Sequence, residues 1–445
     1  MKKWRSQQER TARFLEKKLR KGHKGWTYED VSDPRQAGKV TIPMSQIVRS
    51  LELGLLSNQP TLRDVEALTQ ELAGWTRRLV PAAISDTTLD TEIRRLDVEP
   101  LREMLHERVR DFYRSKMLQP VGLPCGIATL DGKNLATLNH DAAGTGHARS
   151  STNEKWHRTP VEESKQGKDY YLMPALRAVL TSSEAKVCID QLALPPKTGE
   201  STSFGQMVED LHRAYGRSGM FEVIDGDAGL TSLTNANAIN RLGYAYILGL
   251  KGNQPDLFAE AQFVLETQAK REAPEAETPW ELRNGITIRR RLWRTKEMAG
   301  FETSAGRWGH LRQVLLVRQE TKHRDGHIAI EDRYFVTSLL WNYFSPSQIL
   351  IAVRNHWGIE NDANNTMDLQ WHEDSGPWCT KGTAIWALGV LRQLAYNTVQ
   401  ILRRRRLRKK RPDGSRGALM SWRSIFKLIE DVLRHDIDAV MVPAG

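Results

Sequence analysis

The period of the hydrophobic positions changes twice along the chain and divides it into three parts. Over residues 44–116 apolar side chains recur three and four positions apart, which is the period of an amphipathic helix, and Ser85 or Asp86 is placed to cap one of these helices. From about Pro120 short apolar runs between glycines and polar residues take over, a pattern typical of strands. The helical period returns from Ser345 onward. The pattern predicts helices at both ends and a strand-rich centre.

The central part is predicted to alternate strands with helices. Three strand-like runs come first, and then a helix, a strand, a second helix and a further strand follow. These predicted elements are, in order, 125–132, 170–180, 185–194, 203–217, 221–224, 233–243 and 244–250. Such an order predicts a mixed α/β core. A helix is expected over 255–270, and alternating runs between about 275 and 340 predict an antiparallel β insertion.

The composition is that of a soluble protein of two to four domains, or of one large domain with insertions. Of the 445 residues 40% are hydrophobic and 27% charged, and no apolar run approaches the ~20 residues that a membrane helix needs. The basic N-terminus is followed by no apolar stretch and no cleavage site, so we expect no secretory signal and a cytoplasmic protein. Cys125, Cys188 and Cys379 lie far apart, which argues against a disulfide framework and a zinc knuckle.

Positive charge is concentrated near the two ends of the chain. Residues 1–25 hold ten Lys and Arg against two acids, a net of +8, and Arg403–Arg411 holds eight with no acid. Together these runs carry +16, which leaves −5 for the rest of a chain whose net charge is +11. Each run alone is explained by a solvated tail. Two basic arms on one chain favour a polyanion as partner, with nucleic acid first.

Acidic residues stand at three places where a strand ends or a helix is otherwise apolar. They are Asp131 before Gly132, the pair Asp225 and Asp227 in FEVIDGDAGLTS, and Glu360 in RNHWGIEN. Each has a purely structural explanation: a turn former, an Asx-turn or helix cap, and an ion-pair partner of a nearby basic residue. Alternation along the strand predicts that both aspartates of the pair face the same side.

Taken together, these acids are candidate ligands of a divalent metal site. A mixed sheet that presents one Asp at the end of its first strand, another after its fourth, and a Glu from a later helix can gather carboxylates around hard cations such as Mg²⁺. Two such ions can bind the attacking and leaving oxygens of a phosphodiester. The sequence separations of these acids are uninformative without a fold.

The chain resembles the DDE transposases of bacterial insertion sequences, in the branch that carries DPR, LDGK, KGNQP and HWxIEN motifs. The resemblance extends over nearly the whole chain. It rests on Asp33-Pro34-Arg35, SDTTL (85–89), LDGK (130–133), LGLKGNQPDLF (248–258), RYFVTSL (333–339), RNHWGIEN (354–361) and MDLQWHED (367–374).

The resemblance implies an α/β fold: a ribonuclease-H-like mixed sheet with a β-rich insertion, flanked by N-terminal and C-terminal helical regions. It implies Asp131 and Glu360 as the first and third catalytic acids. The second stands 24 residues before the Lys of KGNQP, which selects Asp227 and leaves Asp225 as an extra. These three acids would hold two Mg²⁺ ions, with Mn²⁺ as a substitute, to cut DNA at transposon ends and join the 3′-OH to a target.

The same resemblance implies a division of the chain and a set of partners. The expected parts are a helical DNA-binding region with a basic arm, a catalytic core in two pieces, a β-rich insertion between these pieces, and a basic helical C-terminal region. Their expected bounds, in chain order, are 1–118, 119–270, 271–342, 343–402 and 403–445. Double-stranded DNA, at both the transposon ends and the target, is the expected partner of a protein that is nucleoid-associated, touches no membrane and is a homodimer when bound to DNA.

Candidate DNA contacts accompany the three acids. After Glu373-Asp374 the family has arginines that this chain lacks, and Lys381 is the candidate substitute. The full set of candidates is Lys251, Arg354, Lys381, Arg403, Arg404, Arg405 and Arg406, with Trp293 and Trp308 as possible base-stacking rings. Lys251 is also explained by the end of a strand, and the tryptophans by the core of the insertion. His356 and Trp357 are expected to pack around and orient Glu360.

Two other functions stay open on the sequence alone. A domesticated or decayed transposase would bind DNA without cutting it, and a metal-dependent nuclease would cut without joining the products to a target. The intact set of three acids favours the transposase over the first of these.

Overall fold

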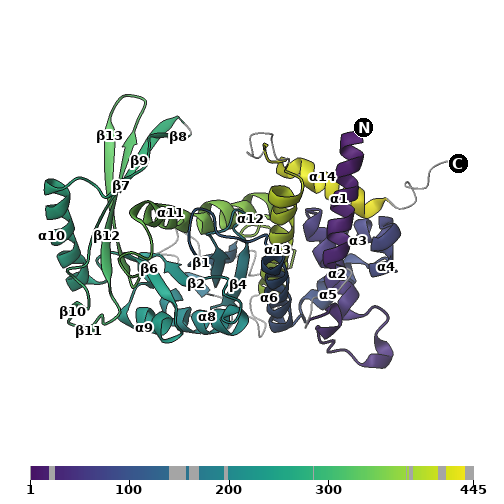
Figure 1. The fold of residues 1–445 in the computed structure, drawn as a ribbon. Helices are drawn as coiled ribbons and strands as arrows, with labels where there is room; N and C mark the ends of the chain where they lie inside the picture. Colours follow the sequence, from purple (N-terminus) through teal and green to yellow (C-terminus); the bar gives the residue numbers. More distant parts are fainter. Residues whose placement is uncertain are drawn as a thin grey trace.

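The structure combines a helical region with a large twisted sheet (Figure 1). It is a computed structural model, and the residues that it describes are 2–19, 26–139, 157–159, 170–194, 199–283, 285–376, 378–379, 384–408 and 417–435. None of the helices in these ranges is both long enough and apolar enough to span a membrane. The predicted mixed α/β architecture with flanking helices is present.

The N-terminal region is helical, as its hydrophobic period predicts. Its elements are α1 (Lys2–Leu19), η1 (Tyr28–Asp30), η2 (Ala37–Lys39), α2 (Met44–Leu56), α3 (Leu62–Glu71), α4 (Gly74–Leu79), α5 (Asp86–Ile93) and α6 (Val98–Arg114). Ser85 is the cap of α5, and its side chain accepts a hydrogen bond from the backbone N of Thr88 at 3.3 Å. The first basic run is therefore not a tail over residues 2–19, because α1 buries Phe14, Leu15 and Leu19 and packs against the C-terminal helix α14 (Trp422–Arg434).

The core sheet forms from the strand-like runs of the centre. Its elements are β1 (Ile127–Asn139), β2 (His157–Thr159), β3 (Tyr170–Leu180), β4 (Cys188–Ala193), α8 (Glu200–Tyr215), β5 (Val223–Gly226), η5 (Ala228–Leu230), α9 (Leu233–Arg241) and β6 (Ala245–Leu250). The strands lie in the order β4-β3-β1-β5-β6, in which β1, β5 and β6 are parallel and β3 and β4 are antiparallel to their neighbours. Helices cover the sheet, so the parallel strands are continuous apolar runs.

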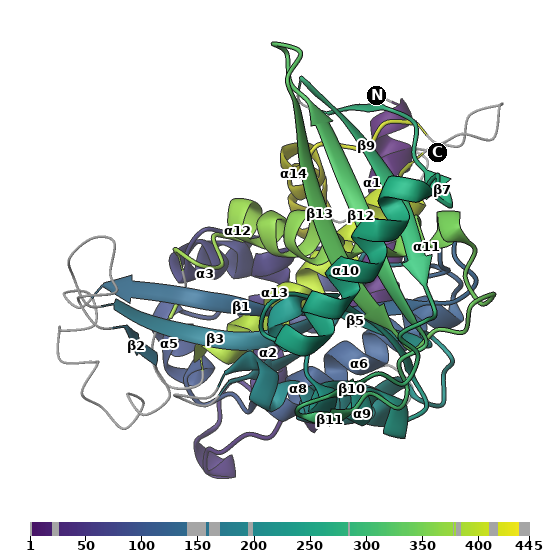
Figure 2. The same cartoon turned by 90° about the vertical axis from the view of Figure 1, so that its left-hand side faces the viewer.

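The predicted insertion is β-rich, and its strands extend the core sheet, except for β10 and β11, which form a separate two-stranded sheet. After α10 (Pro255–Arg271), its strands are β7 (Ala276–Glu277), β8 (Glu281–Arg283), β9 (Ile286–Thr295), β10 (Glu302–Thr303), β11 (Gly306–Arg307), β12 (Gln313–Lys322) and β13 (Ile328–Thr337). The strand β13 pairs antiparallel with β6, in the register Val336 to Leu248. In Figure 2 the long strands β13, β12 and β9 rise from the core beside α10. The core and the insertion therefore share one 11-stranded sheet.

The C-terminal part is helical but contains a break that the sequence did not predict. Its elements are α11 (Pro346–His356), the π-helix η6 (Ile359–Asn364), α12 (Asn365–Trp371), α13 (Ala384–Ile401), the π-helix η7 (Leu402–Arg406) and α14. A single helix was expected through Glu360, whereas α11 ends at His356 and Glu360 lies in η6. The helix α13 is buried along its whole length and packs against α2, α6 and β4, so it joins the helical region to the sheet.

A cluster of carboxylates at the end of the core strands

Two of the three predicted acids lie side by side at one edge of the core sheet. The strands β1 and β5 are parallel, and Leu130 is the register partner of Gly226. Asp131 is the next residue of β1, which continues to Asn139, and Asp227 is the first residue after β5. The two acids are therefore neighbours at the point where the parallel pairing ends, although 96 residues separate them in the sequence.

The backbone around Asp227 is held tightly by its neighbours. Asp227 caps η5, because its Oδ1 accepts a hydrogen bond from the backbone N of Leu230 at 3.1 Å. Asn253 Nδ2 donates to the carbonyl of Ala228 at 2.7 Å. A Cβ on Gly249 would lie 2.8 Å from the backbone N of Ala228, so only glycine allows β6 to pass this close. Asp227 therefore does serve as a helix cap, and the KGNQP segment does serve as a turn that holds the backbone beside it.

The third predicted acid faces the same region from the C-terminal part. Glu360 is exposed and lines a cavity of about 300 Å³ together with Asp227, Lys251 and His356. Trp357 and Arg333 form another wall, where the Arg333 guanidinium lies 4.3 Å from the centre of the Trp357 ring. Residues from the core, the insertion and the C-terminal part thus meet at one cavity.

The negative charges of the cluster act on Asp131. Burial first, and then the charges of Glu360 and Asp227, raise the pKa of Asp131 to about 7. Among the residues that the structure describes, no Lys or Arg forms an ion pair with Asp131, Asp227 or Glu360. The cluster therefore carries negative charge that lysine and arginine do not balance.

Asp225 has a different role from its neighbour Asp227. It is buried, and its Oδ2 accepts a hydrogen bond from Thr129 Oγ1 at 2.9 Å and lies 2.8 Å from His356 Nδ1. Burial lowers the pKa of His356, but the charge of Asp225 and its hydrogen bond more than offset this and raise the pKa to about 9. His356 is therefore held as a cation beside the carboxylates, where Asp225 orients it. The expectation that His356 packs near Glu360 agrees with this geometry.

A fourth carboxylate, missed by the sequence analysis, stands beside the cluster. Glu200 begins α8, and a Cβ on Gly132 would lie 1.7 Å from its Oε1. Burial and then the charge of Asp227 raise the pKa of Glu200. A Glu in the first turn of a helix is ordinarily explained by the helix dipole, so no local signal marks this residue. The position of Glu200 does explain why residue 132, directly after Asp131, is a glycine: a side chain there would collide with the Glu200 carboxylate.

The type of ligand at this edge fits a hard divalent cation. Carboxylate oxygens are the donors that Mg²⁺ prefers, and the raised pKa of Asp131 is what an uncompensated acidic site produces. As the side chains stand, no group of three or more His, Cys, Asp or Glu residues in the described ranges is arranged to hold one ion. The carboxylates therefore have the right chemistry for such a cation and lie in the same region. In the conformation described, however, their side chains do not converge on one point.

The segment MDLQWHED locks the Glu360 region onto the sheet. Glu373 is fully buried, and its carboxylate accepts hydrogen bonds from Arg177 Nη2 at 2.9 and 3.0 Å. Lys133 of LDGK forms an ion pair with Asp368 at 2.6 Å. These pairs join β1 and β3 to α12 and to the turn that follows it, so Glu373 has a structural role here.

The three residues predicted to contact DNA near the cavity differ in their surroundings. Lys251 is exposed at the cavity. Arg354 forms an ion pair with Glu281 of β8 at 2.8 Å, which ties α11 to the insertion. Lys381 lies outside the described residues. The DNA-binding role of these residues stays a prediction.

The arginines after α13 are part of the folded body, which corrects their description as an arm. Residues 403–406 lie in η7, and their contacts reach α14, α1, η6 and the turn after β3. The partners are as follows: Arg403 lies 4.7 Å from the Trp422 ring centre, Arg404 lies 3.6 Å from Asp362, Arg405 lies 3.2 Å from Glu184, and Arg406 lies 5.9 Å from the Phe14 ring centre. Two of these four arginines, Arg404 and Arg405, therefore have a carboxylate partner within the protein.

The two tryptophans proposed to stack on a base are core residues of the insertion. Trp293 is 3% exposed and Trp308 is 1% exposed. The indole Nε1 of Trp293 donates to the carbonyl of Glu272 at 3.0 Å. Neither ring is available to a base in this structure, because apolar neighbours already cover it.

Comparison with known proteins gives two matches. A family profile described as "Transposase DDE domain" matches residues 141–397, which include Asp227 and Glu360 and begin after Asp131. A protein of Xanthobacter autotrophicus, named "Uncharacterized protein in dhlA 3'region", is 27% identical over 157 residues. That match covers 35% of this chain and 50% of the relative, so the chain spans about half the length of the curated relative.

Proposed function

The chain belongs to the family of the transposase DDE domain, and from this premise we propose that it is an insertion-sequence transposase that cuts DNA at transposon ends and joins the ends to target DNA. The observation that carries the proposal is the shared edge of β1 and β5, where Asp131 and Asp227 are neighbours and Glu360 faces them. The strand order β4-β3-β1-β5-β6 supports a ribonuclease-H-like core.

Asp131, Asp227 and Glu360 would hold two Mg²⁺ ions, or Mn²⁺ in their place. Bound there, such ions would supply positive charge to a phosphodiester undergoing displacement. The side chains around them prepare this site. Asp225 fixes His356 beside the carboxylates, and the bulk of Trp357 forms one wall of the cavity.

The cavity also offers cations to an incoming DNA backbone. Lys251 is exposed at its rim, and within the described residues its side chain forms no hydrogen bond or ion pair. Arg333 faces the same cavity from β13. We assign both to phosphate contacts near the scissile bond. Double-stranded DNA as substrate and a homodimer on DNA remain parts of this proposal.

The test is a comparison of DNA cutting and DNA binding by matched variants. Wild type should cut duplex DNA that carries a transposon end in Mg²⁺ and join the new 3′-OH to a target duplex. Asp131→Asn, Asp227→Asn and Glu360→Gln should each lose cutting and still bind the duplex in Ca²⁺. Glu297→Gln, an exposed acid of the insertion, is the control and should cut normally.

Other outcomes would support the alternatives. Binding without cutting by the wild type would indicate a decayed transposase, and cutting without joined products would indicate a nuclease. Near wild-type cutting by any of the three site variants would remove that residue from the site.

A further inference from the structure

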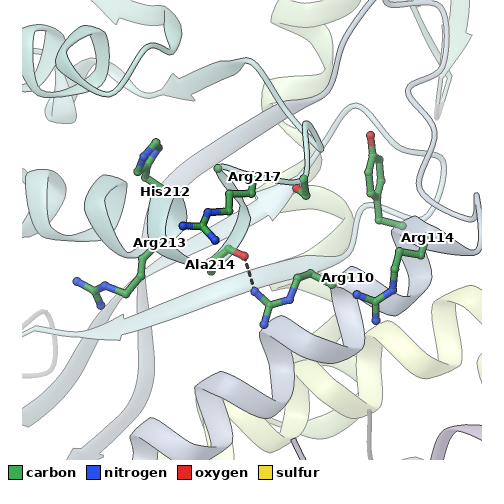
Figure 3. A pocket seen from close by; sticks show the side chains of 9 residues that line it. Arg110, Arg114, His212, Arg213, Ala214 and Arg217 are labelled. Atoms are coloured by element: carbon green, nitrogen blue, oxygen red, sulfur yellow. Dashed lines mark hydrogen bonds between the residues drawn. The ribbon is translucent and has the colours of Figure 1, made fainter. Parts of the chain in front are cut away.

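A cleft rich in arginine lies where α6 and α8 end. Its volume is about 750 Å³, and Figure 3 shows arginine side chains that reach it from both helix ends and from the turn after α8. The arginines that line it are Arg110, Arg114, Arg213 and Arg217, and His212 lies beside them. Neither the family match nor the proposed catalytic site includes an explanation for this concentration of positive charge.

The cleft lies at the opposite edge of the sheet from the carboxylates. The helix α8 begins at Glu200, beside Gly132, and ends at Tyr215 next to the cleft. A helix of 16 residues is about 24 Å long at a rise of about 1.5 Å per residue. A second hollow that shares His212 with the cleft is lined by Phe221 and Tyr244, which precede β5 and β6. The two charged regions are therefore separate sites at opposite ends of the core strands.

Helix capping explains only part of this charge. Arg110 donates to the carbonyl of Ala214 at 2.6 Å and to Glu107 at 2.5 Å, which is the ordinary role of a cation at a helix C-terminus. Arg114 approaches Glu107 only to 4.0 Å, and its side chain is 52% exposed.

The guanidinium groups of the remaining two arginines have still fewer partners within the protein. Arg213 reaches Asp210 at 3.1 Å, but its side chain is 75% exposed, and Asp210 already accepts a hydrogen bond from Arg102 at 2.8 Å. Arg217 is exposed and forms no hydrogen bond or ion pair within the described residues. Four guanidinium groups thus face the cleft against two carboxylates, one of which is shared with Arg102.

We propose that this arginine cleft binds phosphate groups of a DNA backbone, at a segment other than the one that reaches Asp131 and Asp227. Guanidinium groups present paired N–H donors that match phosphate oxygens. Their exposure favours a polymer that runs across the surface over a small anion, which needs an enclosed pocket for its affinity. The inference rests on the proposed function for the identity of the polymer, and a transposase must hold DNA on more than one side of its cut.

The test is the salt dependence of binding to a duplex that lacks any transposon end, measured in EDTA. The variant is Arg114→Gln with Arg217→Gln, since both side chains are exposed and their loss leaves the fold intact. Each lost phosphate contact should reduce the slope of log K against log salt by about 0.9, so the double variant should lose about 1.8. The control is Arg271→Gln with Arg307→Gln, which removes the same charge from exposed positions on α10 and β11.

The control should keep the wild-type slope. An equal slope in the wild type and the double variant would overturn the proposal, and so would an equal reduction in both double variants, since that would show an effect of net charge alone. Calorimetric titration with inorganic pyrophosphate separates the sources of phosphate: saturable binding that the cleft variant loses, with no change in the DNA slope, would replace DNA by a small phosphate ligand. Absence of Mg²⁺-dependent cutting by the wild type would contradict the proposed function and leave the slope measurement valid.

Discussion

Carboxylates contact the core sheet in two places: at Glu373, and at the cluster formed by Asp131, Asp227 and Glu360. The two places differ in whether a cation balances the negative charge. Glu373 is fully buried and is bound by Arg177, which is itself fully buried. Asp131 and Asp227 face Glu360 instead, with no Lys or Arg ion pair to them in the described part of the chain. The buried carboxylate of Glu373 thus has a cationic partner, whereas the acids beside the cavity face one another.

The two environments move the pKa in opposite directions. Burial raises the pKa of both Glu373 and Asp131. At Glu373 the charge and hydrogen bonds of Arg177 outweigh burial, so the pKa is lowered; at Asp131 neighbouring acids add to burial, and the pKa rises to about 7. Burial alone therefore does not distinguish a structural carboxylate from a ligand-binding one. The partner does.

The largest expected effect comes from breaking the balanced group. Glu373→Gln should lower the free energy of unfolding by about 3–5 kcal/mol, because Arg177 then stays buried without its counter-charge. Urea unfolding measures this, with Glu297→Gln as a surface control that should change it by less than about 0.5 kcal/mol. A loss for Glu373→Gln as small as that of the control would refute the structural role of this pair.

A smaller loss of stability is expected when the partner of His356, the cation beside the acidic cluster, is changed. Asp225→Asn should cost about 1–3 kcal/mol, since His356 loses its charged hydrogen-bond partner. The pKa of His356 should fall from about 9, because burial, which lowers it, is no longer offset by the charge of Asp225. NMR titration of the imidazole in EDTA reports this pKa. An unchanged value would mean that Asp225 does not control His356.

The unbalanced group should give the metal-free protein a distinctive pH dependence. The pKa of Asp131 is about 7 in the folded state, against about 3.9 in an unfolded chain. Between these values the folded state binds more protons, so this residue makes the free energy of unfolding fall as the pH rises from about 4 to about 7. Asp131→Asn should remove that contribution in EDTA. Parallel curves of stability against pH for the variant and the wild type would contradict it.

The smallest effect is expected at Gly132. In Gly132→Ala the new Cβ meets the flexible end of Glu200, which can move away, so stability should change by less than about 1 kcal/mol. Gly249→Ala is the comparison, because its Cβ meets backbone at 2.8 Å and should cost about 1–3 kcal/mol. Thermal unfolding of both variants ranks them. A larger cost at Gly132 would show that Glu200 is rigidly fixed.

The sequence predicted the elements of the fold better than their contacts. Hydrophobic periods marked the strands of the core and of the insertion, and Asp227 does follow the end of its strand. The expected strand end after Asp131 was wrong, because β1 continues to Asn139 as a hairpin arm with β3; what ends at Leu130 is its pairing with β5. The pairing of β13 with β6 was not predictable, because both edges of a strand look alike in a hydrophobic pattern.

The errors at charged residues share one physical cause. A count of charges sees the run after Arg403 as a free basic arm, but Arg405 pairs with Glu184, which is 221 positions away. In the same way, Asp225 is matched with His356 across 131 positions. Residues this far apart in the sequence become partners only through the fold. The local sequence therefore reveals a charged residue but not the residue that neutralises it.

The most direct test of the account is Mn²⁺ binding to the metal-free protein, followed by electron paramagnetic resonance. The account predicts saturable binding by the wild type, its loss in Asp227→Asn, and its retention in Asp225→Asn, since only Asp227 belongs to the unbalanced edge while Asp225 is already matched by His356. Equal binding by the wild type and Asp227→Asn, or loss in Asp225→Asn alone, would contradict it.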